Sequence, residues 1–236
     1  MKRRALVSAV LVATFAFLIG LRELARSPTV QVFGRLVARV DASERVIALT
    51  FDDGPAMEVL NEIIEVLAAR RVRATFFVTG AELAAVPDAG RKLVAAGHEL
   101  GNHTYSHRRM VFKSSGFVRQ EVEDTDALIR ASGHMGEIYF RPPFGYKLLS
   151  LPWFLMRTGR TSVTWDIEPD SYPEVAASSS AIVAHVVERV QPGSIILLHV
   201  WYASRQTSLA AVPMIIDELK REGYRFVTLS ELLRTT

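Results

Sequence analysis

Residues 46–55, VIALTFDDGP, decide how the rest of the sequence is interpreted. The first six are almost all apolar and include β-branched and aromatic side chains, which is typical of a strand buried on both faces. Asp52 and Asp53 follow at once, before a Gly-Pro pair. A purely structural interpretation of residues 52–55 is a solvent-exposed turn, since Asp, Gly and Pro all favour turns. However, adjacent carboxylates at the mouth of a core repel each other unless a cation or a proton separates them. The stretch therefore predicts a buried strand that ends in an acidic site.

Beyond this strand, β-rich runs alternate with segments of helical spacing. Apolar residues recur with helical spacing at 59–67, and the segments 117–129, 181–190 and 209–219 are similar. This alternation predicts an α/β protein with parallel strands. A complete eight-unit barrel usually takes about 250 residues, so a barrel here would be short or irregular, and an open sheet stays possible. The six further predicted strands are 74–78, 99–102, 138–141, 162–165, 194–199 and 225–228.

Composition excludes several classes of site. The 236 residues contain no cysteine, so a thiolate metal site or a cysteine nucleophile is impossible. Residues 1–40 carry seven Lys and Arg against Glu23 alone, a charge of +6, and the total of +3 leaves 3 − 6 = −3 for the remainder. The folded part therefore has no basic footprint, and we expect no nucleic-acid partner.

The N-terminal segment has the pattern of a targeting sequence. Lys2, Arg3 and Arg4 precede residues 5–21, which carry no charge and are almost wholly apolar. No convincing cleavage site follows, and seventeen residues is the lower limit for crossing a bilayer. We expect 1–26 to be a signal-anchor or a signal peptide, 27–44 a connector, and 45–236 one domain outside the cytoplasm. The protein would then be membrane-anchored, or secreted if the segment is cleaved. A buried N-terminal helix is the remaining alternative.

Ionisable residues follow the predicted strands at their carboxyl ends. His103 and His107 come after the third strand, Arg141 closes the fourth, Asp166 and Glu168 follow the fifth, and His199 ends the sixth. In parallel α/β folds these ends converge on one face, where active sites are built. Two histidines four residues apart, placed on a helical turn, point the same way and with one carboxylate make a common catalytic metal site.

Each of these residues also has a structural interpretation. The pair at 103 and 107 can arise by chance on a surface helix, and His199 could be a core histidine bonded to backbone. Arg141 precedes Pro142 and Pro143, which end a central strand on their own account. The combination at several strand ends favours chemistry over these alternatives.

Taken together, the residues resemble the polysaccharide deacetylases that share the NodB homology domain, carbohydrate esterase family 4. The resemblance covers residues 46–233. The motifs, in the family's order, are TFDDGP at 50–55, HTYSH at 103–107, RPPFG at 141–145, the stretch 165–172, and LLH at 197–199. The third motif has Phe144 where the family usually has Tyr, and the fourth lacks the usual Asp-Trp pair.

The resemblance implies a fold and a role for each residue. The fold is a distorted (β/α) barrel of seven or eight units behind an N-terminal hydrophobic anchor helix. Asp52 is implied as the general base, Arg141 as the group that orients it, and His199 as the general acid. Glu168 matches by position the carboxylate that supports His199, although Asp166 or Asp170 could equally do so. The implied metal ligands are Asp53, His103 and His107.

The resulting functional hypothesis is a metal-dependent hydrolase that removes N-acetyl groups from a carbohydrate polymer. Peptidoglycan, a chitin-like polymer or an exported polysaccharide would be the substrate. Zinc suits the ligands best, while cobalt, nickel or manganese could also occupy them. The alternatives are an esterase that removes O-acetyl groups from xylan or another glycan, a hydrolase of a small amide or imide, and a catalytically weakened glycan-binding homologue.

Overall fold

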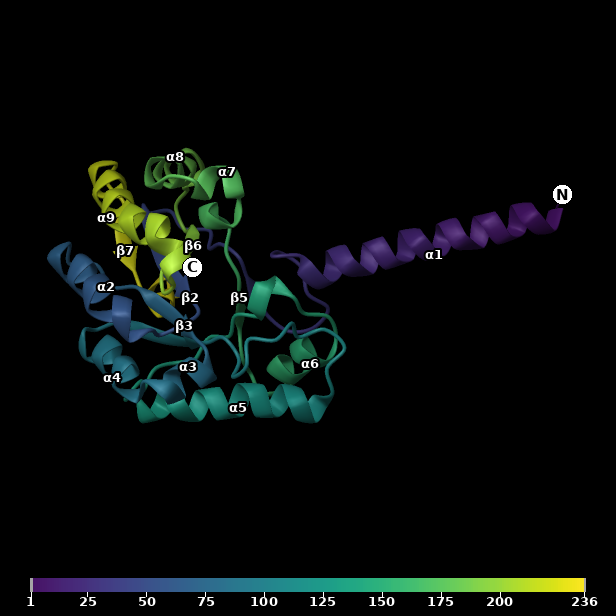
Figure 1. The fold of residues 1–236 in the computed structure, drawn as a ribbon, viewed down its shortest axis with the longest axis horizontal. Coiled ribbons are helices and arrows are strands. Elements are labelled where there is room, and N and C mark those ends of the chain that lie inside the picture. The colour runs from purple at the N-terminus through teal and green to yellow at the C-terminus, as the bar shows by residue number, and fades with distance from the viewer. Residues whose placement is uncertain (1, 236) are drawn as a thin grey trace.

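The computed structural model describes residues 2–235. A long helix, α1 (Lys2–Arg26), projects away from a rounded domain that contains all the other elements (Figure 1). Its run Leu6–Arg26 has a mean hydropathy of 1.9, and the apolar window within it is not buried against the domain. By length and composition this helix can cross a membrane.

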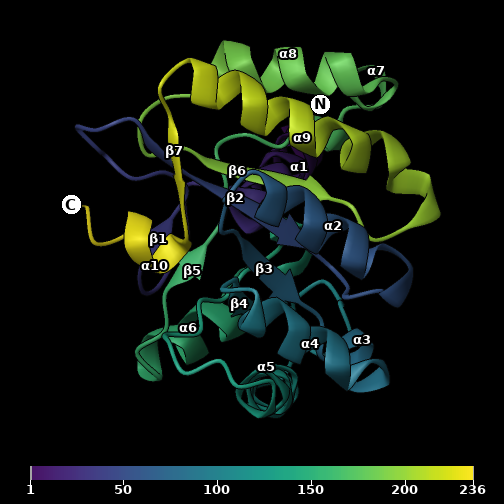
Figure 2. The ribbon, with the colours of Figure 1, turned by 90° about the vertical axis from the view of Figure 1, so that its left-hand side faces the viewer.

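A parallel sheet forms the centre of the domain, with helices around it (Figure 2). Its strands run in the order β4-β3-β2-β6, and β7 also pairs with β2. The central strand β2 is buried along its whole length, as its apolar sequence predicts. The strands are β2 (Val46–Asp52), β3 (Thr75–Val78), β4 (Glu99–Asn102), β6 (Ile195–His199) and β7 (Arg225–Val227).

Two shorter strands, β1 (Leu36–Val37) and β5 (Ser162–Val163), pair with each other in parallel. Single bridges link Asn102 to Phe140, Phe140 to Ser162, and Arg39 to Ser194. These links join the short pair to both sides of the main sheet, which fits a distorted barrel. The strand predicted at 138–141 is reduced to the bridges of Phe140, because Pro142 and Pro143 have no N–H with which to extend a ladder.

The predicted helices form, three of them with wider bounds, whereas the one predicted at 181–190 begins two residues earlier and ends one residue earlier. Their apolar faces pack on the sheet in a core that includes Leu60 and Ile63 of α2 and Ile215 and Ile216 of α9. Short 3-10 turns occur at Pro143–Gly145, Pro169–Ser171 and Ala203–Arg205. The helices after α1 are α2 (Met57–Ala69), α3 (Gly80–Ala85), α4 (Pro87–Ala95), α5 (Ser115–Ala131), α6 (Ser150–Arg157), α7 (Pro173–Ala176), α8 (Ser179–Arg189), α9 (Gln206–Arg221) and α10 (Leu229–Leu232).

The end of α1 is attached directly to the domain. Ala25 is buried, and its carbonyl accepts a hydrogen bond from the N–H of Lys147 at 2.8 Å. The buried ammonium of Lys147 donates to the carbonyl of Ser27 at 2.5 Å, and burial lowers the pKa of this lysine to about 8. The segment 27–44, predicted as a connector, contains β1, which pairs with β5 of the domain.

Candidate active site

A hollow of about 290 Å3 lies where the carboxyl ends of β2, β4 and β6 meet. Asp52 is the last residue of β2, His103 follows β4, and His199 is the last residue of β6. These strands are parallel, so the side chains at their carboxyl ends meet at one edge of the sheet. The lining includes every residue assigned above as a base, a metal ligand or an acid: Asp52, Asp53, His103, His107 and His199.

Asp53, His103 and His107 form a group that could hold a metal ion. One ligand atom from each lies within 4.8 Å of the others. The Nε2 atom of His107 is 3.1 Å from Oδ1 of Asp53, and that of His103 is 3.8 Å from the same oxygen. Among residues 2–235 this is the group of His, Asp and Glu side chains with metal-binding geometry.

Two details show that these residues fit a cation. Oδ1 of Asp53 is buried and accepts no hydrogen bond, which is costly for a carboxylate unless something else binds it. Nδ1 of His103 lies 2.8 Å from the carbonyl of Arg141. A carbonyl only accepts, so Nδ1 carries the proton and Nε2 presents its lone pair to the site. Burial and the neighbouring His107 lower the pKa of His103 to about 3, which keeps the ring neutral and able to bind metal.

The loop between the two histidines differs from the helical turn expected from their spacing. Residues 103–109 are not helical, and Thr104 and His107 have φ angles of 67° and 53°. The carboxylate of Glu121 on α5 holds this loop by accepting from the N–H and the hydroxyl of Ser106 at 2.8 and 2.6 Å. The two rings still come together, with centroids 4.9 Å apart, through a different backbone path.

Asp52 is held by a buried arginine. Arg141 is fully buried and donates to Oδ1 of Asp52 at 2.6 Å. The same guanidinium donates to the hydroxyl of Thr50 and to the carbonyls of Val163 and Thr164. Burial raises the pKa of Asp52, while the charge of Arg141 opposes that shift. The result is a fixed, desolvated carboxylate that can accept a proton.

Asp170 is the carboxylate that supports His199. Its Oδ1 lies 3.1 Å from Nδ1 of His199, and its Oδ2 accepts from the backbone N–H of His199 at 2.7 Å. Ser208 donates to the same carboxylate at 2.9 Å. Burial alone lowers the pKa of His199, but the hydrogen bond and the charge of Asp170 outweigh it and raise the pKa to about 9. At neutral pH the ring is therefore protonated.

The other two candidates for that supporting role do other things. Glu168, matched to it by motif position, lines the hollow but accepts a hydrogen bond from Ser171 at 2.6 Å. Asp166 accepts from Ser194 and from the N–H of Ile195, both at 2.7 Å, and so braces the start of β6. The 3-10 turn at Pro169–Ser171 carries the chain so that Asp170, two residues later than the motif position, meets His199.

Several left-handed residues shape the site. Asp53 has φ of 70° and Phe144 has φ of 56°, each costing about 1–2 kcal/mol for an L-residue. The next residue, Gly54, lies against the ring of Trp201, where a Cβ would come within 2.6 Å of ring carbons. Only glycine fits at this point, and the turn after the acidic pair is fixed as a result.

A second hollow of about 640 Å3 adjoins the first and shares Phe144, Trp165 and Glu168 with it. Its far wall contains Glu23 and Arg26 of α1. Arg109 lies over the rings of Phe144 and Tyr146 at 5.3 and 5.1 Å, and Arg205 lines the first hollow. The reasoning from sequence did not single out Trp165, Arg109 or Arg205. The available signal was their position along the chain: Arg109 lies just after the second motif, Trp165 begins the fourth, and Arg205 comes soon after His199.

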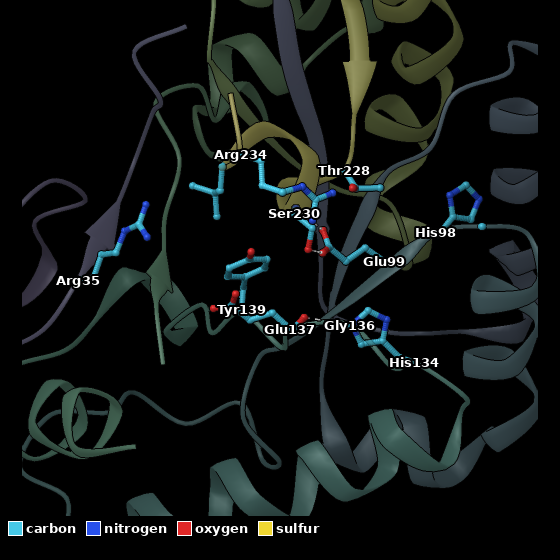
Figure 3. A pocket seen from close by; sticks show the side chains of 12 residues that line it. Arg35, His98, Glu99, His134, Gly136, Glu137, Tyr139, Thr228, Ser230 and Arg234 are labelled. Carbon is cyan, nitrogen blue, oxygen red and sulfur yellow. Dashed lines mark hydrogen bonds between the residues drawn. The ribbon is translucent and has the colours of Figure 1, made fainter. Parts of the chain in front are cut away.

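A third hollow, of about 470 Å3, lies near the amino ends of β3 and β4 (Figure 3). It contains His98, Glu99, His134 and Tyr139, so it too is rich in ionisable groups. Glu99, however, accepts hydrogen bonds from Thr75 and from both the N–H and the hydroxyl of Ser230. His98 Nδ1 accepts from the N–H of Ala74, and His134 pairs with the carbonyl of Glu137. These bonds give the groups structural roles.

The fold, and the Asp53, His103 and His107 group that could hold a metal ion, fit a metal-dependent hydrolase. The protein-family model for polysaccharide deacetylases matches residues 39–161 of the chain. A peptidoglycan-N-acetylglucosamine deacetylase from Bacillus cereus is 33% identical over 201 residues, covering 85% of this chain and 94% of that protein. The chain belongs to the polysaccharide deacetylase family.

Solved structures agree with this assignment. The Bc1960 peptidoglycan N-acetylglucosamine deacetylase superposes with a TM-score of 0.79 at 30% identity, over 85% of this chain and 94% of that one. A pseudoenzyme of carbohydrate esterase family 4 from Bacillus anthracis gives a TM-score of 0.76 at 25% identity, over 86% and 70% of the two chains. Both support the expected fold class.

Proposed function

We propose that this protein removes N-acetyl groups from peptidoglycan with the help of a divalent metal, most suitably zinc. The observation that carries the proposal is the buried Oδ1 of Asp53, which accepts no hydrogen bond and lies beside two imidazoles, with Asp52 and His199 lining the same hollow. The similarity to a peptidoglycan-N-acetylglucosamine deacetylase supports peptidoglycan as the polymer. The absence of cysteine leaves histidine and carboxylate ligands, which suit zinc, cobalt, nickel or manganese.

Asp53, His103 and His107 would hold the metal. When bound, a divalent ion here supplies Lewis acidity that lowers the pKa of a water molecule to about 7. Asp52 would take a proton from the attacking water, since Arg141 holds its carboxylate in place and burial raises its pKa. The water oxygen would then bond to the carbonyl carbon of the sugar's acetamide group. The backbone N–H of Phe144 is the proposed donor to the developing oxyanion, a contribution of about 3 kcal/mol.

His199 completes the reaction as the general acid. An amide nitrogen leaves only when it is protonated, because its anion is a very poor leaving group. The pKa of about 9 keeps His199 charged at neutral pH, and the bond to Asp170 orients the ring. Proton transfer to the sugar nitrogen releases the amine and acetate. Glu168, which also lines the hollow, is proposed to contact the substrate.

The same proposal includes a place for the protein in the cell. Residues 1–26 would anchor the chain in a membrane, with residues 45–236 as the deacetylase domain on the outer side. The exposed apolar surface of α1 supports this assignment, and so do the cations at its start, before the apolar run. Cleavage after α1 would instead release a secreted enzyme.

The test is acetate release by the full-length protein in detergent, with zinc or cobalt added, from peptidoglycan and from N-acetylglucosamine oligomers. The matched control is Asp52→Asn, which keeps size and metal ligands. We expect metal-dependent release that falls about 10²–10⁴-fold in the variant, because the general base is lost. Equal rates for the two proteins would refute the assignment of Asp52.

The rival functions give different results in the same assay. An O-acetyl esterase would release acetate from acetylated xylan and leave the N-acetyl substrates intact. A weakened glycan-binding homologue would bind metal and polymer without releasing acetate. The similarity to a pseudoenzyme makes this second outcome worth testing, although the five residues that the mechanism needs are all present here.

A further inference from the structure

The domain exposes several large apolar side chains. Some of them lie on α6, which is on the side of the domain from which α1 leaves (Figure 1). They come from three segments that are far apart in the sequence: the stretch after α1, the loop after His107, and α6 with its preceding residue. We call this cluster the foot surface. Its members are Val30, Val32, Phe112, Leu149, Trp153 and Met156.

Contacts among the three segments make the foot surface one continuous region. Phe33 packs edge-on against Trp153 with ring centroids 5.2 Å apart, which joins the first segment to α6. Met110 and Lys147 form a parallel bridge, so the loop carrying Phe112 runs beside the chain that leads to Leu149. An apolar hollow of about 220 Å3 then joins Phe112 and Leu148 to Leu18 and Leu21 of α1.

Phe112 is the most unusual member. Its side chain is 84% exposed, and its φ of 54° is a left-handed conformation that disfavours a bulky residue. Nothing in the domain core gains from placing an aromatic ring there. An exposed apolar patch of this kind marks a site of contact with a membrane, another protein or a ligand.

The three segments that carry the foot surface contain basic residues and no acidic ones. The segments 24–40, 103–120 and 141–165 contain no Asp or Glu, although residues 41–236 carry a net charge of −3. These segments therefore carry exposed cations close in sequence to the apolar side chains and no acidic residue, among them Arg108 and Arg157, with Lys113 half-buried next to Phe112 in the chain. Apolar and aromatic side chains together with Lys and Arg are what an anionic lipid surface binds.

We propose that the foot surface rests on an anionic phospholipid bilayer, with Phe112 and Trp153 inserted at the level of the headgroups. Continuity with α1 selects this partner, because the same apolar hollow is shared by the helix that would cross the bilayer and the loop that would lie on it. The inference rests on the membrane-spanning role proposed for α1 and is independent of the proposed activity. It also places the active-site cleft beside the lipid, since Arg26 of α1 and Phe144 line one hollow.

Two sites of equal exposure allow a matched test. Phe112 is 84% exposed on the foot surface, whereas Met135 is 85% exposed in the turn after α5, beside residues that line the hollow at the amino ends of the strands. Because the chain has no cysteine, Phe112→Cys and Met135→Cys each give one labelling position. Full-length protein carrying a spin label at either position is reconstituted in nanodiscs containing phosphatidylglycerol, and collisions with oxygen and with a water-soluble nickel complex are measured.

We expect the label at 112 to gain oxygen collisions and to lose most nickel collisions, and the label at 135 to behave as in water. Equal, water-like behaviour at both positions would overturn the docking proposal, and so would a protein that separates from the discs. Circular dichroism of the same samples shows whether both variants are folded. Acetate release measured beside it separates the two proposals, since either activity or docking can fail while the other persists.

Discussion

The two ends of the sheet contain similar residues in opposite situations. Near the amino ends of the strands, buried Glu99 accepts three hydrogen bonds from Thr75 and Ser230 (Figure 3). At the carboxyl ends, buried Asp53 leaves one oxygen without any hydrogen bond. Burial of a carboxylate is therefore common to both ends. What distinguishes the candidate active site is a buried carboxylate oxygen that accepts no hydrogen bond and could bind a cation.

Backbone conformation shows the same contrast. Six non-glycine residues in the described chain have positive φ, and four of them surround the candidate metal site: Asp53, Thr104, His107 and Phe144. Strain of this kind persists only where the surrounding structure fixes it, and it concentrates at functional sites. At the amino ends of the strands the buried polar groups are hydrogen-bonded and stabilise the fold. At the carboxyl ends the backbone is strained, and a buried carboxylate oxygen lacks a hydrogen bond.

The largest expected effect comes from removing a ligand at the carboxyl ends. His103→Ala takes away one of the three proposed metal ligands, so we expect loss of bound metal and of essentially all acetate release. Metal content after dialysis, measured by mass spectrometry alongside activity, checks this. A variant that keeps both its metal and its rate would show that His103 is not a ligand.

A smaller effect is expected from the turn that presents Asp53. Gly54→Ala puts a methyl group against the ring of Trp201 and forces a left-handed alanine, which we expect to cost about 1–3 kcal/mol of stability and to weaken metal binding. Gly116→Ala is the control, because its Cβ meets nothing within 4 Å. Urea unfolding with and without metal compares the two. Equal midpoints would mean that the turn tolerates a side chain.

Asp170→Asn should change the pH dependence more than the maximal rate. The pKa of His199, about 9, falls toward its ordinary value when the charge of Asp170 is removed. The acid is then lost at lower pH, so the basic limb of the pH–rate profile moves down, with about a tenfold loss at pH 8 and much less at pH 6. Because the folded pKa is raised, the matching stability is present at low pH and disappears as pH rises through about 9. An unmoved basic limb would remove His199 from the role of acid.

The smallest effect on catalysis is expected at the amino ends of the strands. Glu99→Gln replaces an acceptor of three hydrogen bonds by a weaker one, so we expect a loss of about 1–3 kcal/mol in unfolding free energy. Activity per folded molecule should stay within about twofold of the parent, since this hollow lies away from the metal ligands. A large fall in kcat without loss of stability would contradict the contrast between the two ends.

Most of the architecture and most of the site could be predicted because both depend on local patterns. The buried strand at 46–52 is visible in its unbroken apolar run, and helical spacing marks α2 and α9. The position of polar residues at strand ends brought Asp52, His103 and His199 to one face on topological grounds alone. The fold class expected from the sequence is confirmed by the similar solved structures.

The remaining features depend on contacts between distant segments, which a single sequence does not show. Asp170 rather than Glu168 meets His199 because a 3-10 turn intervenes, and its geometry is set by packing against α8 and β6. The histidine pair lies on a loop held by Glu121, fifteen residues beyond Ser106. The short β1 strand pairs with β5 across 126 residues, so the stretch after α1 carried too little local signal to predict it.

The buried Lys147 that clamps the end of α1 has one further consequence. A flexible tether would let a catalytic domain wander far from its attachment point, with a reach that grows with tether length. Here the carbonyls of Ala25 and Ser27 accept hydrogen bonds from Lys147, three residues beyond Phe144. With α1 as the anchor, the domain would therefore be held against the end of the helix. It could work only on glycan passing within its own width of the lipid. An enzyme held this close to the membrane would act on the polymer only while the polymer lies near the lipid. Deacetylation would then come early, before the polymer moves outward.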